Sequence, residues 1–352
     1  MTPNLDTYPA TLRGVLAGRG LTEDQAAALI GAVMDETLTP IRASALLAAL
    51  AAKGESVAEV VGAARAMRER SVRVEHGLPL VMDIVGTGGD GAHTINLSTA
   101  AAFVVAGCGV PVAKHGNRAA SSLCGSADVL EELGVPLDRG PEDSAHALRT
   151  GGICFMFAQR HHPAMRAVAP IRRELGVRTV FNVLGPLTNP AAANRALIGV
   201  AHPDQVELVA AALQALGVTA GAVVHAEDGL DEISGESPTQ VLQFDREGVR
   251  RWTLDPAAYG VHAARASILG GDARANAAAL LAIIENERSE RADLVALNAA
   301  LALVIAGEAV DLEDGLVRAR TAIAQGRARA ALDALVMGGT KQSVQAVPRD
   351  TV

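Results

Sequence analysis

The chain has 352 residues, of which 49% are apolar, so it is long enough for one large domain or two unequal domains with ample core. Its 31 basic and 39 acidic residues give a formal net charge of −8 without a polybasic run, which argues against nonspecific binding to nucleic acid. Its three cysteines, Cys108, Cys124 and Cys154, lack CxxC spacing, so they predict neither a disulfide framework nor a metal site and favour a reducing compartment.

Met1 to Thr7 lacks the basic and then apolar pattern of a signal peptide, and no apolar stretch reaches the roughly 18 residues needed to span a bilayer. We therefore expect a cytoplasmic protein with no membrane segment.

The N-terminal part of the chain predicts a helical subdomain. Residues 8–70 are rich in Ala and Leu at helical spacing, with capping residues at Thr22 and Ser56 and no strand pattern.

From about residue 78 the pattern changes to apolar strands that alternate with helices. Strands are predicted at 80–85, 110–113, 153–155, 196–200 and 221–225. This alternation predicts an α/β fold with a mainly parallel sheet. Residues 240–244 and 249–254 alternate like a hairpin, and helices return from about 272 to 336. The tail from Gly338 to Val352 has the composition of a disordered segment.

A glycine-containing loop, Gly86 to Asp90, follows the first predicted strand. Its glycines let backbone N–H groups point at an anion, and Asp90 adds a carboxylate suited to a metal ion or a hydroxyl. Residues 94–99 then supply side chains suited to capping a helix at Ala100 to Cys108, whose N-terminus is a second anion seat. The plainer interpretation of the glycines is an ordinary turn, because turns need residues that tolerate positive φ.

A second loop follows the apolar run 110–113. That run is expected to deliver Lys114 and the following histidine into a turn, and serines then lead into a helix at Ala127 to Leu133. Two strand–loop–helix units stocked with anion-binding groups predict one phosphorylated ligand that spans both loops. The GxxxxGK[ST] spacing of a P-loop is absent, and the GxGxxG pattern is not met at Gly86.

Adjacent carboxylates, Asp231 and Glu232, follow a predicted buried strand at Val223 to His225. Ligands in parallel α/β sheets collect at such strand ends. A carboxylate pair there can hold Mg²⁺, which keeps much of its water and bridges to substrate phosphates, and Ser98 could add a neutral oxygen. The plainer interpretation of the pair is a solvated turn.

These loops resemble the anthranilate phosphoribosyltransferase family. The match continues through later segments in order and spacing, and it covers roughly residues 8 to 336. The later segments are His162 to Arg166, Arg172 to Gly176, Thr179 to Asn182, Leu184 to Pro190, Gly270 to Asp272 with Asn276, and Leu297 to Ala300. The chain departs from the family pattern at Gln159, where proline is common, and at Cys124, in a loop where small polar residues are more usual.

The resemblance implies a small helical domain hinged to a larger α/β domain, whose central, mainly parallel sheet is surrounded by helices. The small domain would comprise residues 1–75 plus helices near 163–182, and the α/β domain residues 78–162 and 183–337, with a disordered tail at 338–352. The active site would lie in the cleft between the domains. The resemblance also implies a homodimer through the helical domain.

The reaction implied is transfer of the phosphoribosyl group of 5-phosphoribosyl-1-pyrophosphate (PRPP) to the amine of anthranilate, with release of pyrophosphate, in tryptophan biosynthesis. It needs no covalent enzyme nucleophile. The residues implied for PRPP are Gly86, Gly89, Asp90, Thr94, Asn96, Ser98, Thr99, Lys114, Asn117, Arg118, Ser121, Ser122 and Ser126. Those implied for anthranilate are Gly86, His115, Asn117, His162 and Arg172. Ser98, Asp231 and Glu232 would hold Mg²⁺, with two ions per active site.

Several alternatives stay open from the sequence alone. Arg172 also fits a solvated helix face, and the histidines also fit structural positions. A pyrimidine-nucleoside phosphorylase of the same fold is a rival function, although the pair Asp231 and Glu232 would be superfluous there. A catalytically silent homologue that binds nucleic acid is a second rival, although the basic surface it needs is missing. We therefore expect small-molecule substrates as partners, and neither nucleic acid nor a membrane.

Overall fold

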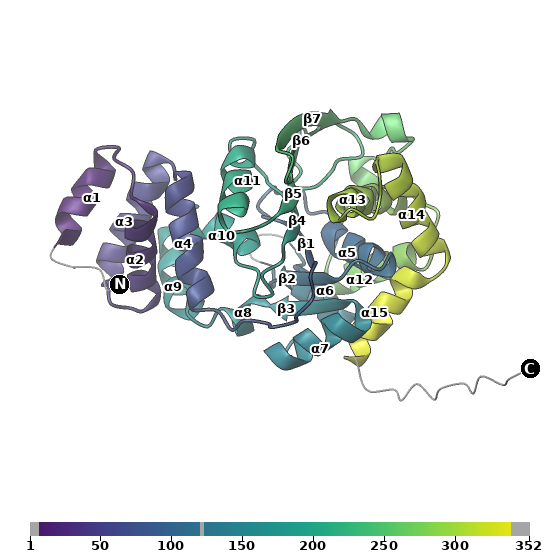
Figure 1. Ribbon diagram of the computed structural model, residues 1–352, viewed down its shortest axis with the longest axis horizontal. Helices are drawn as coiled ribbons and strands as arrows, with labels where there is room; N and C mark the ends of the chain where they lie inside the picture. The colour runs from purple at the N-terminus through teal and green to yellow at the C-terminus, as the bar shows by residue number, and fades with distance from the viewer. Residues whose placement is uncertain (1–6, 120–122, 339–352) are drawn as a thin grey trace, which may run out of the picture.

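The computed structural model describes residues 7–119 and 123–338. The molecule is elongated, and helices α1 to α4 form one end of it (Figure 1). Their bounds are α1 (Tyr8–Leu16), α2 (Glu23–Met34), α3 (Pro40–Lys53) and α4 (Val57–Glu69). The expected caps at Thr22 and Ser56 are confirmed, because each forms a reciprocal capping box with the third residue of its helix. Helices α2 and α4 therefore begin where the sequence predicts.

A seven-stranded sheet occupies the centre of the α/β part of the described chain. Its strands are β1 (Met82–Gly86), β2 (Val112–Gly116), β3 (Ile153–Phe157), β4 (Arg195–Gly199), β5 (Ala220–Ala226), β6 (Thr239–Phe244) and β7 (Val249–Leu254). The order is β3-β2-β1-β4-β5-β6-β7, with the first five strands parallel and the last two added antiparallel. The predicted mainly parallel sheet and its hairpin are confirmed.

Helices cover both faces of this sheet (Figure 1). Those between the strands are α5 (Leu97–Gly107), α6 (Ser126–Glu132), α7 (Pro141–Gly151), α8 (Ala158–His161), α9 (Met165–Leu175), α10 (Phe181–Leu187) and α11 (Gln205–Ala215). After β7 come η2 (Pro256–Tyr259), η3 (Arg265–Ile268), α12 (Ala273–Ile284), α13 (Glu290–Ala306), α14 (Leu312–Ala324) and α15 (Arg327–Met337). Helix α5 begins before the predicted Ala100. None of the described helices is long and apolar enough to cross a membrane.

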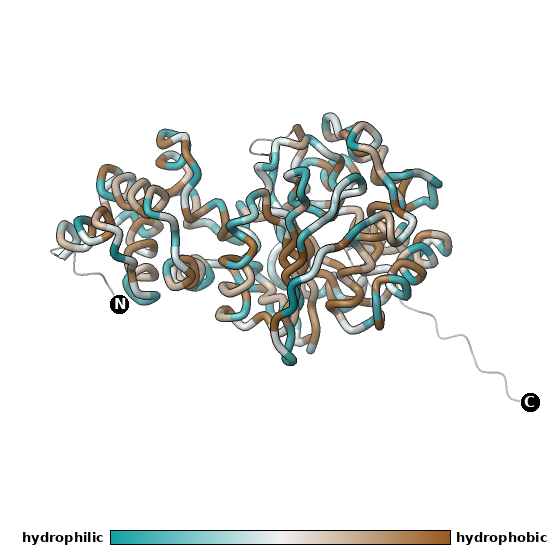
Figure 2. Tube along the Cα trace, turned by 90° about the horizontal axis from the view of Figure 1, so that it is seen from above, coloured by the Kyte–Doolittle hydropathy of each residue, from teal (hydrophilic) through white to brown (hydrophobic). Residues whose placement is uncertain are grey.

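Neighbouring strand residues pack on opposite faces of the sheet. Leu197 belongs to a core shared with α5 and α12 to α15, whereas Ile198 belongs to a second core shared with α2 to α4 and α9 to α11. Side chains in a strand alternate between faces, so one strand serves both cores. Figure 2 shows apolar residues gathered along the strands and the helices that pack on them.

Helix α9 contacts α2 and α3, so the segment near 163–182 lies against the N-terminal helices. Its Val168 is fully buried in the same core as those helices. The second core thus runs without a break from the N-terminal helices to the sheet. The predicted disordered tail, from residue 339 on, lies outside the described residues.

Candidate active site

A cavity of about 710 Å³ opens at the carboxyl ends of β1 and β2 and reaches α9 and α10. Every residue that the sequence predicts for PRPP, anthranilate or metal lines it, apart from Ser121 and Ser122, which lie outside the described residues. The cavity therefore gathers groups from widely separated segments of the chain. Its position agrees with the rule that parallel α/β sheets bind ligands beyond the carboxyl ends of their strands.

The loop after β1 is shaped by glycines. Gly88 and Gly89 have φ values of 71° and 84°, a region that favours glycine. A Cβ atom on Gly86 would collide with the Asp231 carboxylate, so glycine there allows two loops to meet. The Gly88 N–H donates to Asp231 Oδ2 at 2.6 Å. The first glycine loop and the predicted metal loop are thus in direct contact.

The two carboxylates lie in surroundings that call for a cation. Burial and the neighbouring Glu232 raise the pKa of Asp231 well above its usual range. Burial also raises the pKa of Glu232, and the positive charge of Lys114 opposes that rise. Without a cation the pair would tend to hold protons, so its oxygen donors fit Mg²⁺.

In the described residues no group of three or more His, Cys, Asp or Glu side chains is arranged to hold a metal ion. The Asp231 and Glu232 pair would therefore need further ligands. Phosphate oxygens and water are what Mg²⁺ usually takes beside one or two carboxylates.

The N-terminus of α5 is already engaged by an anion from the protein itself. The backbone N–H of Ser98 donates to Glu232 Oε1 at 3.1 Å. The predicted anion seat at this helix therefore holds the Glu232 carboxylate, which the helix dipole favours. The sequence predicts that side chains of residues 94–99 cap this helix; Asn96 occupies the N-cap position, but its side chain makes no capping hydrogen bond.

Asn96 instead ties two loops together. Its Nδ2 donates to the Cys124 carbonyl at 3.2 Å, and its Oδ1 accepts from Asn276 Nδ2 at 3.0 Å. Asn276 in turn accepts the N–H of Gly271 at 2.8 Å. The Asn96 amide thus donates to one segment and accepts from another, so this residue fixes the shape of the cavity wall.

Lys114 lies inside β2 and not in the turn after it, which corrects the prediction from sequence. The strand extends to Gly116, and Lys114 is only 3% exposed. Its Nζ donates to the Ile84 carbonyl at 2.8 Å and to Ser98 Oγ at 3.3 Å. Burial lowers the pKa of Lys114, and the carboxylates of Asp83 and Glu232 oppose that shift. The lysine is thus a fixed positive charge beside the carboxylate pair.

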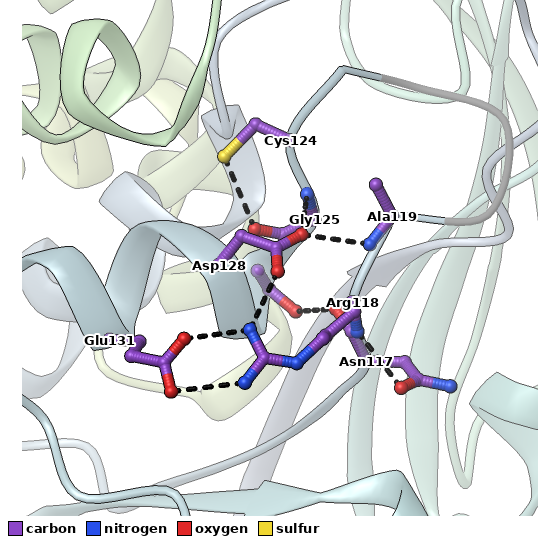
Figure 3. A network of polar contacts seen from close by, with 8 residues as sticks. Asn117, Arg118, Ala119, Cys124, Gly125, Asp128 and Glu131 are labelled. Carbon is purple, nitrogen blue, oxygen red and sulfur yellow. Dashed lines mark hydrogen bonds and ion pairs between the residues drawn. The ribbon is translucent and has the colours of Figure 1, made fainter.

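Arg118 braces the second loop (Figure 3). Its guanidinium donates to Glu131 at 2.7 and 3.0 Å and to Asp128 at 2.9 Å. Asp128 also accepts the N–H groups of Ala119 and Gly125 at 2.9 Å each. The arginine lines the cavity, but its planar fork is occupied by these carboxylates. A phosphate contact by Arg118 would have to compete with them.

Two neutral histidines stand at the other side of the cavity. The rings of His115 and His162 lie 4.9 Å apart at 57°, and His115 Nδ1 is 3.2 Å from the Gly185 carbonyl. Burial lowers the pKa of His115 well below its usual value and that of His162 to about 4. Both are therefore uncharged at neutral pH, and their flat faces suit an aromatic ring. Gln159 also lines the cavity.

Arg172 lies in α9, half-buried at the wall of the cavity. Its guanidinium carbon is 6.0 Å from the centre of the Phe181 ring. Burial lowers its pKa, and within residues 7–119 and 123–338 the guanidinium has neither a hydrogen bond nor an ion pair. Such a group is available to a carboxylate ligand.

Sequence reasoning missed Arg178 and Asn182 as cavity residues. The resemblance covers Thr179 to Asn182 without giving the segment a role. Arg178 stands directly before that segment, and its positive charge next to a matched motif is the signal that could have found it.

Comparisons with known proteins match both parts of the chain. Residues 78–329 match the model of the glycosyl transferase family a/b domain, and residues 9–71 that of its helical bundle domain. The chain is 50% identical to an anthranilate phosphoribosyltransferase of Pelotomaculum thermopropionicum over 92% of this chain and 94% of the relative.

Two solved structures are also similar. The anthranilate phosphoribosyltransferase of Thermus thermophilus has a TM-score of 0.88 and 43% identity, covering 93% of this chain and 98% of the other. The Saccharomyces cerevisiae enzyme in complex with PRPP and Mg has a TM-score of 0.87 and 25% identity, covering 95% and 98%.

Proposed function

This chain belongs to the anthranilate phosphoribosyltransferase family, and we propose that it transfers the phosphoribosyl group of PRPP to the amine of anthranilate, releasing pyrophosphate, as a step of L-tryptophan biosynthesis. One observation carries the proposal. A single cavity joins a buried carboxylate pair with a fixed lysine to a neutral histidine pair with an unpaired arginine. The first set suits a metal-bound diphosphate, and the second suits an aromatic acid.

Asp231, Glu232 and Ser98 are the proposed magnesium residues. Bound Mg²⁺ would offset the charge that gathers on the pyrophosphate oxygens. We propose two ions per site, because two carboxylates and a diphosphate offer separate sets of oxygens. The yeast relative, which binds PRPP and Mg, supports the choice of metal. A titration with Mg²⁺, monitored by calorimetry, measures the number of ions bound per site.

The proposed donor residues are those implied by the resemblance, in the two loops and α5. The Gly86 to Asp90 loop lines the cavity. The N–H groups of Thr87 and Gly88 are engaged by the Gly199 carbonyl and Asp231, so we assign the phosphate oxygens to the Gly89 and Asp90 end of the loop. Lys114 contributes through its charge beside Ser98. Asn96 and Arg118 keep the loops in shape, because their side chains are already engaged. Ser121 and Ser122 stay predictions.

The proposed acceptor residues are Arg172, His115, His162, Asn117 and Gly86. Arg172 would pair with the anthranilate carboxylate, and the neutral histidines would contact the aromatic ring. An aromatic amine is uncharged at neutral pH and can attack C1 of the ribose without a covalent enzyme intermediate. Alignment of the amine with C1 is worth several kcal/mol of the barrier on effective-molarity arguments.

We propose a homodimer that forms through the N-terminal helices. Ile41 is 83% exposed on α3, and Leu16 is 69% exposed at the end of α1. Large apolar side chains in that position suit an interface between two copies. Light scattering coupled to size-exclusion chromatography tests it, with Ile41→Glu as the variant expected to be monomeric.

The function is tested by mixing purified protein with PRPP, Mg²⁺ and anthranilate and following the loss of anthranilate fluorescence. Omission of any one component should stop the reaction. A reaction that instead needs a nucleoside and inorganic phosphate would identify a nucleoside phosphorylase. Fluorescence that stays constant with all components present would contradict the proposal.

A further inference from the structure

Arg178 stands between two cavities. It follows α9 in the loop that leads to α10, and it lines both the large cavity and a second cavity of about 240 Å³. The second cavity lies against the end of α3 and the start of α11. Within residues 7–119 and 123–338, the Arg178 guanidinium has no hydrogen bond and no ion pair. A half-buried guanidinium without such contacts favours an anionic ligand.

On the side of the large cavity, Arg178 lies against the glycine loop. Its Nη1 is 3.2 Å from the position that a Cβ atom would take on Gly89. Gly89 has φ 84°, and the preceding Gly88 has φ 71°, so this backbone forms the tight turn after β1. A diphosphate seated on the turn would be within reach of the guanidinium, whose donors match phosphate oxygens in two-point geometry.

On the side of the second cavity, Arg178 faces an anion from the helical end of the molecule. Glu55 follows α3 and lines this cavity. Its Oε1 is buried without a hydrogen-bond partner in the described residues. Burial raises the pKa of Glu55, and the positive charges of Lys53 and, to a smaller extent, Arg178 oppose this rise. Arg178 thus lies between the Glu55 carboxylate on one side and the Gly88–Gly89 turn on the other.

We propose that Arg178 binds the diphosphate of the donor, and then the released pyrophosphate, against the Gly88–Gly89 turn. Glu55 is the competing anion that attracts Arg178 when no diphosphate is present. This inference rests on the proposed function, because it names a further residue for the same donor. It also makes Arg178 a determinant of the preference for a diphosphate over a monophosphate, since only the longer diphosphate group can reach both the turn and the guanidinium.

The test measures binding of pyrophosphate with Mg²⁺ by calorimetry and, separately, the KM values of both substrates. Arg178→Ala should weaken pyrophosphate binding by about ten- to a hundredfold and raise the KM for PRPP, with little change for anthranilate. Arg178→Lys should restore part of the affinity, because the charge stays but the planar fork is lost. Inorganic phosphate should be affected much less. Glu55→Gln should tighten pyrophosphate binding by about two- to fivefold.

The matched control is Arg149→Ala, which removes the same charge from an exposed position of α7 that lines neither cavity. It should bind pyrophosphate like the unmodified chain. Arg178→Gln keeps most of the side-chain volume, so it gives the answer if the alanine variant is unstable. If Arg178→Ala and Arg178→Gln both bind pyrophosphate as tightly as the unmodified chain, the inference is wrong and the proposed function is unaffected. An unmodified chain that neither binds pyrophosphate nor consumes anthranilate overturns both.

Discussion

The two sides of the large cavity are built differently. The donor side, which we define as the Gly86 to Asp90 loop with Lys114, Asp231 and Glu232, is held by internal hydrogen bonds. The acceptor side, which we define as His115, His162 and Arg172, leaves polar atoms without partners in the described residues. They include both ring nitrogens of His162 and the Arg172 guanidinium. The donor side is therefore held by contacts within the chain, whereas the acceptor side has polar groups left available to a ligand.

This difference has an energetic reason. A highly charged leaving group needs charges that are already fixed, because reorganising dipoles during the reaction costs energy. A planar aromatic acid needs shape and one counter-charge, and buried groups without partners penalise any ligand that fails to meet them. Substitutions on the donor side should therefore lower turnover or weaken PRPP binding, and those on the acceptor side should mainly weaken anthranilate binding.

The largest effect is expected for Asp231→Asn and Glu232→Gln. Each removes the charge of a proposed metal ligand, so turnover should fall by about a hundredfold or more while the fold stays intact. High Mg²⁺ should restore activity only in part. Steady-state rates measured across a Mg²⁺ series test this, with Glu227→Gln, on the same loop but exposed, as the control. Near-normal rates in both variants at limiting Mg²⁺ would remove these residues from the donor side.

Lys114→Met should have the next largest effect. It keeps much of the side-chain volume and deletes the charge beside Ser98 and Glu232. The KM for PRPP should rise by about ten- to a hundredfold, and the KM for anthranilate far less. Equal changes in the two KM values would mean that the lysine does not act on the donor. Thermal unfolding of the variant separates this result from a loss of stability.

Arg172→Ala tests the acceptor side. Loss of a charge-assisted contact should cost about 1.5 to 3 kcal/mol, seen mainly as a higher KM for anthranilate. Arg172→Lys should rescue incompletely, because an ammonium loses the two-point geometry. The neighbouring Arg173 is exposed and does not line the cavity, so Arg173→Ala is the control. Unchanged kinetics in Arg172→Ala would move the carboxylate anchor to another residue.

The smallest effect is expected in the pH dependence of the free energy of unfolding, to which His162 of the acceptor side contributes. His162 has its pKa lowered to about 4 in the folded chain, mainly by burial. An unfolded histidine binds a proton below about pH 6.5, so His162 lowers stability as the pH falls through that value. Between pH 7 and pH 5, the free energy of unfolding should therefore fall by about 1 to 2 kcal/mol less in His162→Gln than in the unmodified chain. Denaturant unfolding at both pH values measures it, and parallel losses would show that His162 is not held neutral.

Much of the fold and most of the cavity could be predicted from local patterns. Thr22 and Ser56 are each followed by a residue that completes a capping box, so four consecutive residues are enough to predict the start of each helix. The apolar runs before Gly86 and before Asp231 predict buried strands, and groups directly after parallel strands meet at one edge of the sheet.

Other features depend on contacts between distant segments. Asn96 meets Asn276 across 180 positions of the chain, which no local pattern indicates. Lys114 lies within β2 because the Ile84 carbonyl and Ser98 give its ammonium partners in the interior, so a charged residue did not end the strand as the sequence suggested. Arg118 meets Asp128 and Glu131 across 10 and 13 positions of the chain.

The most direct measurement is a calorimetric titration of PRPP with Mg²⁺ into the protein in the absence of anthranilate. A donor side that is held by contacts within the chain predicts Mg²⁺-dependent binding of one PRPP per chain. That binding should be lost in Asp231→Asn and unchanged in Arg172→Ala. Binding that ignores Mg²⁺, or that disappears in Arg172→Ala while Asp231→Asn binds normally, would contradict the account.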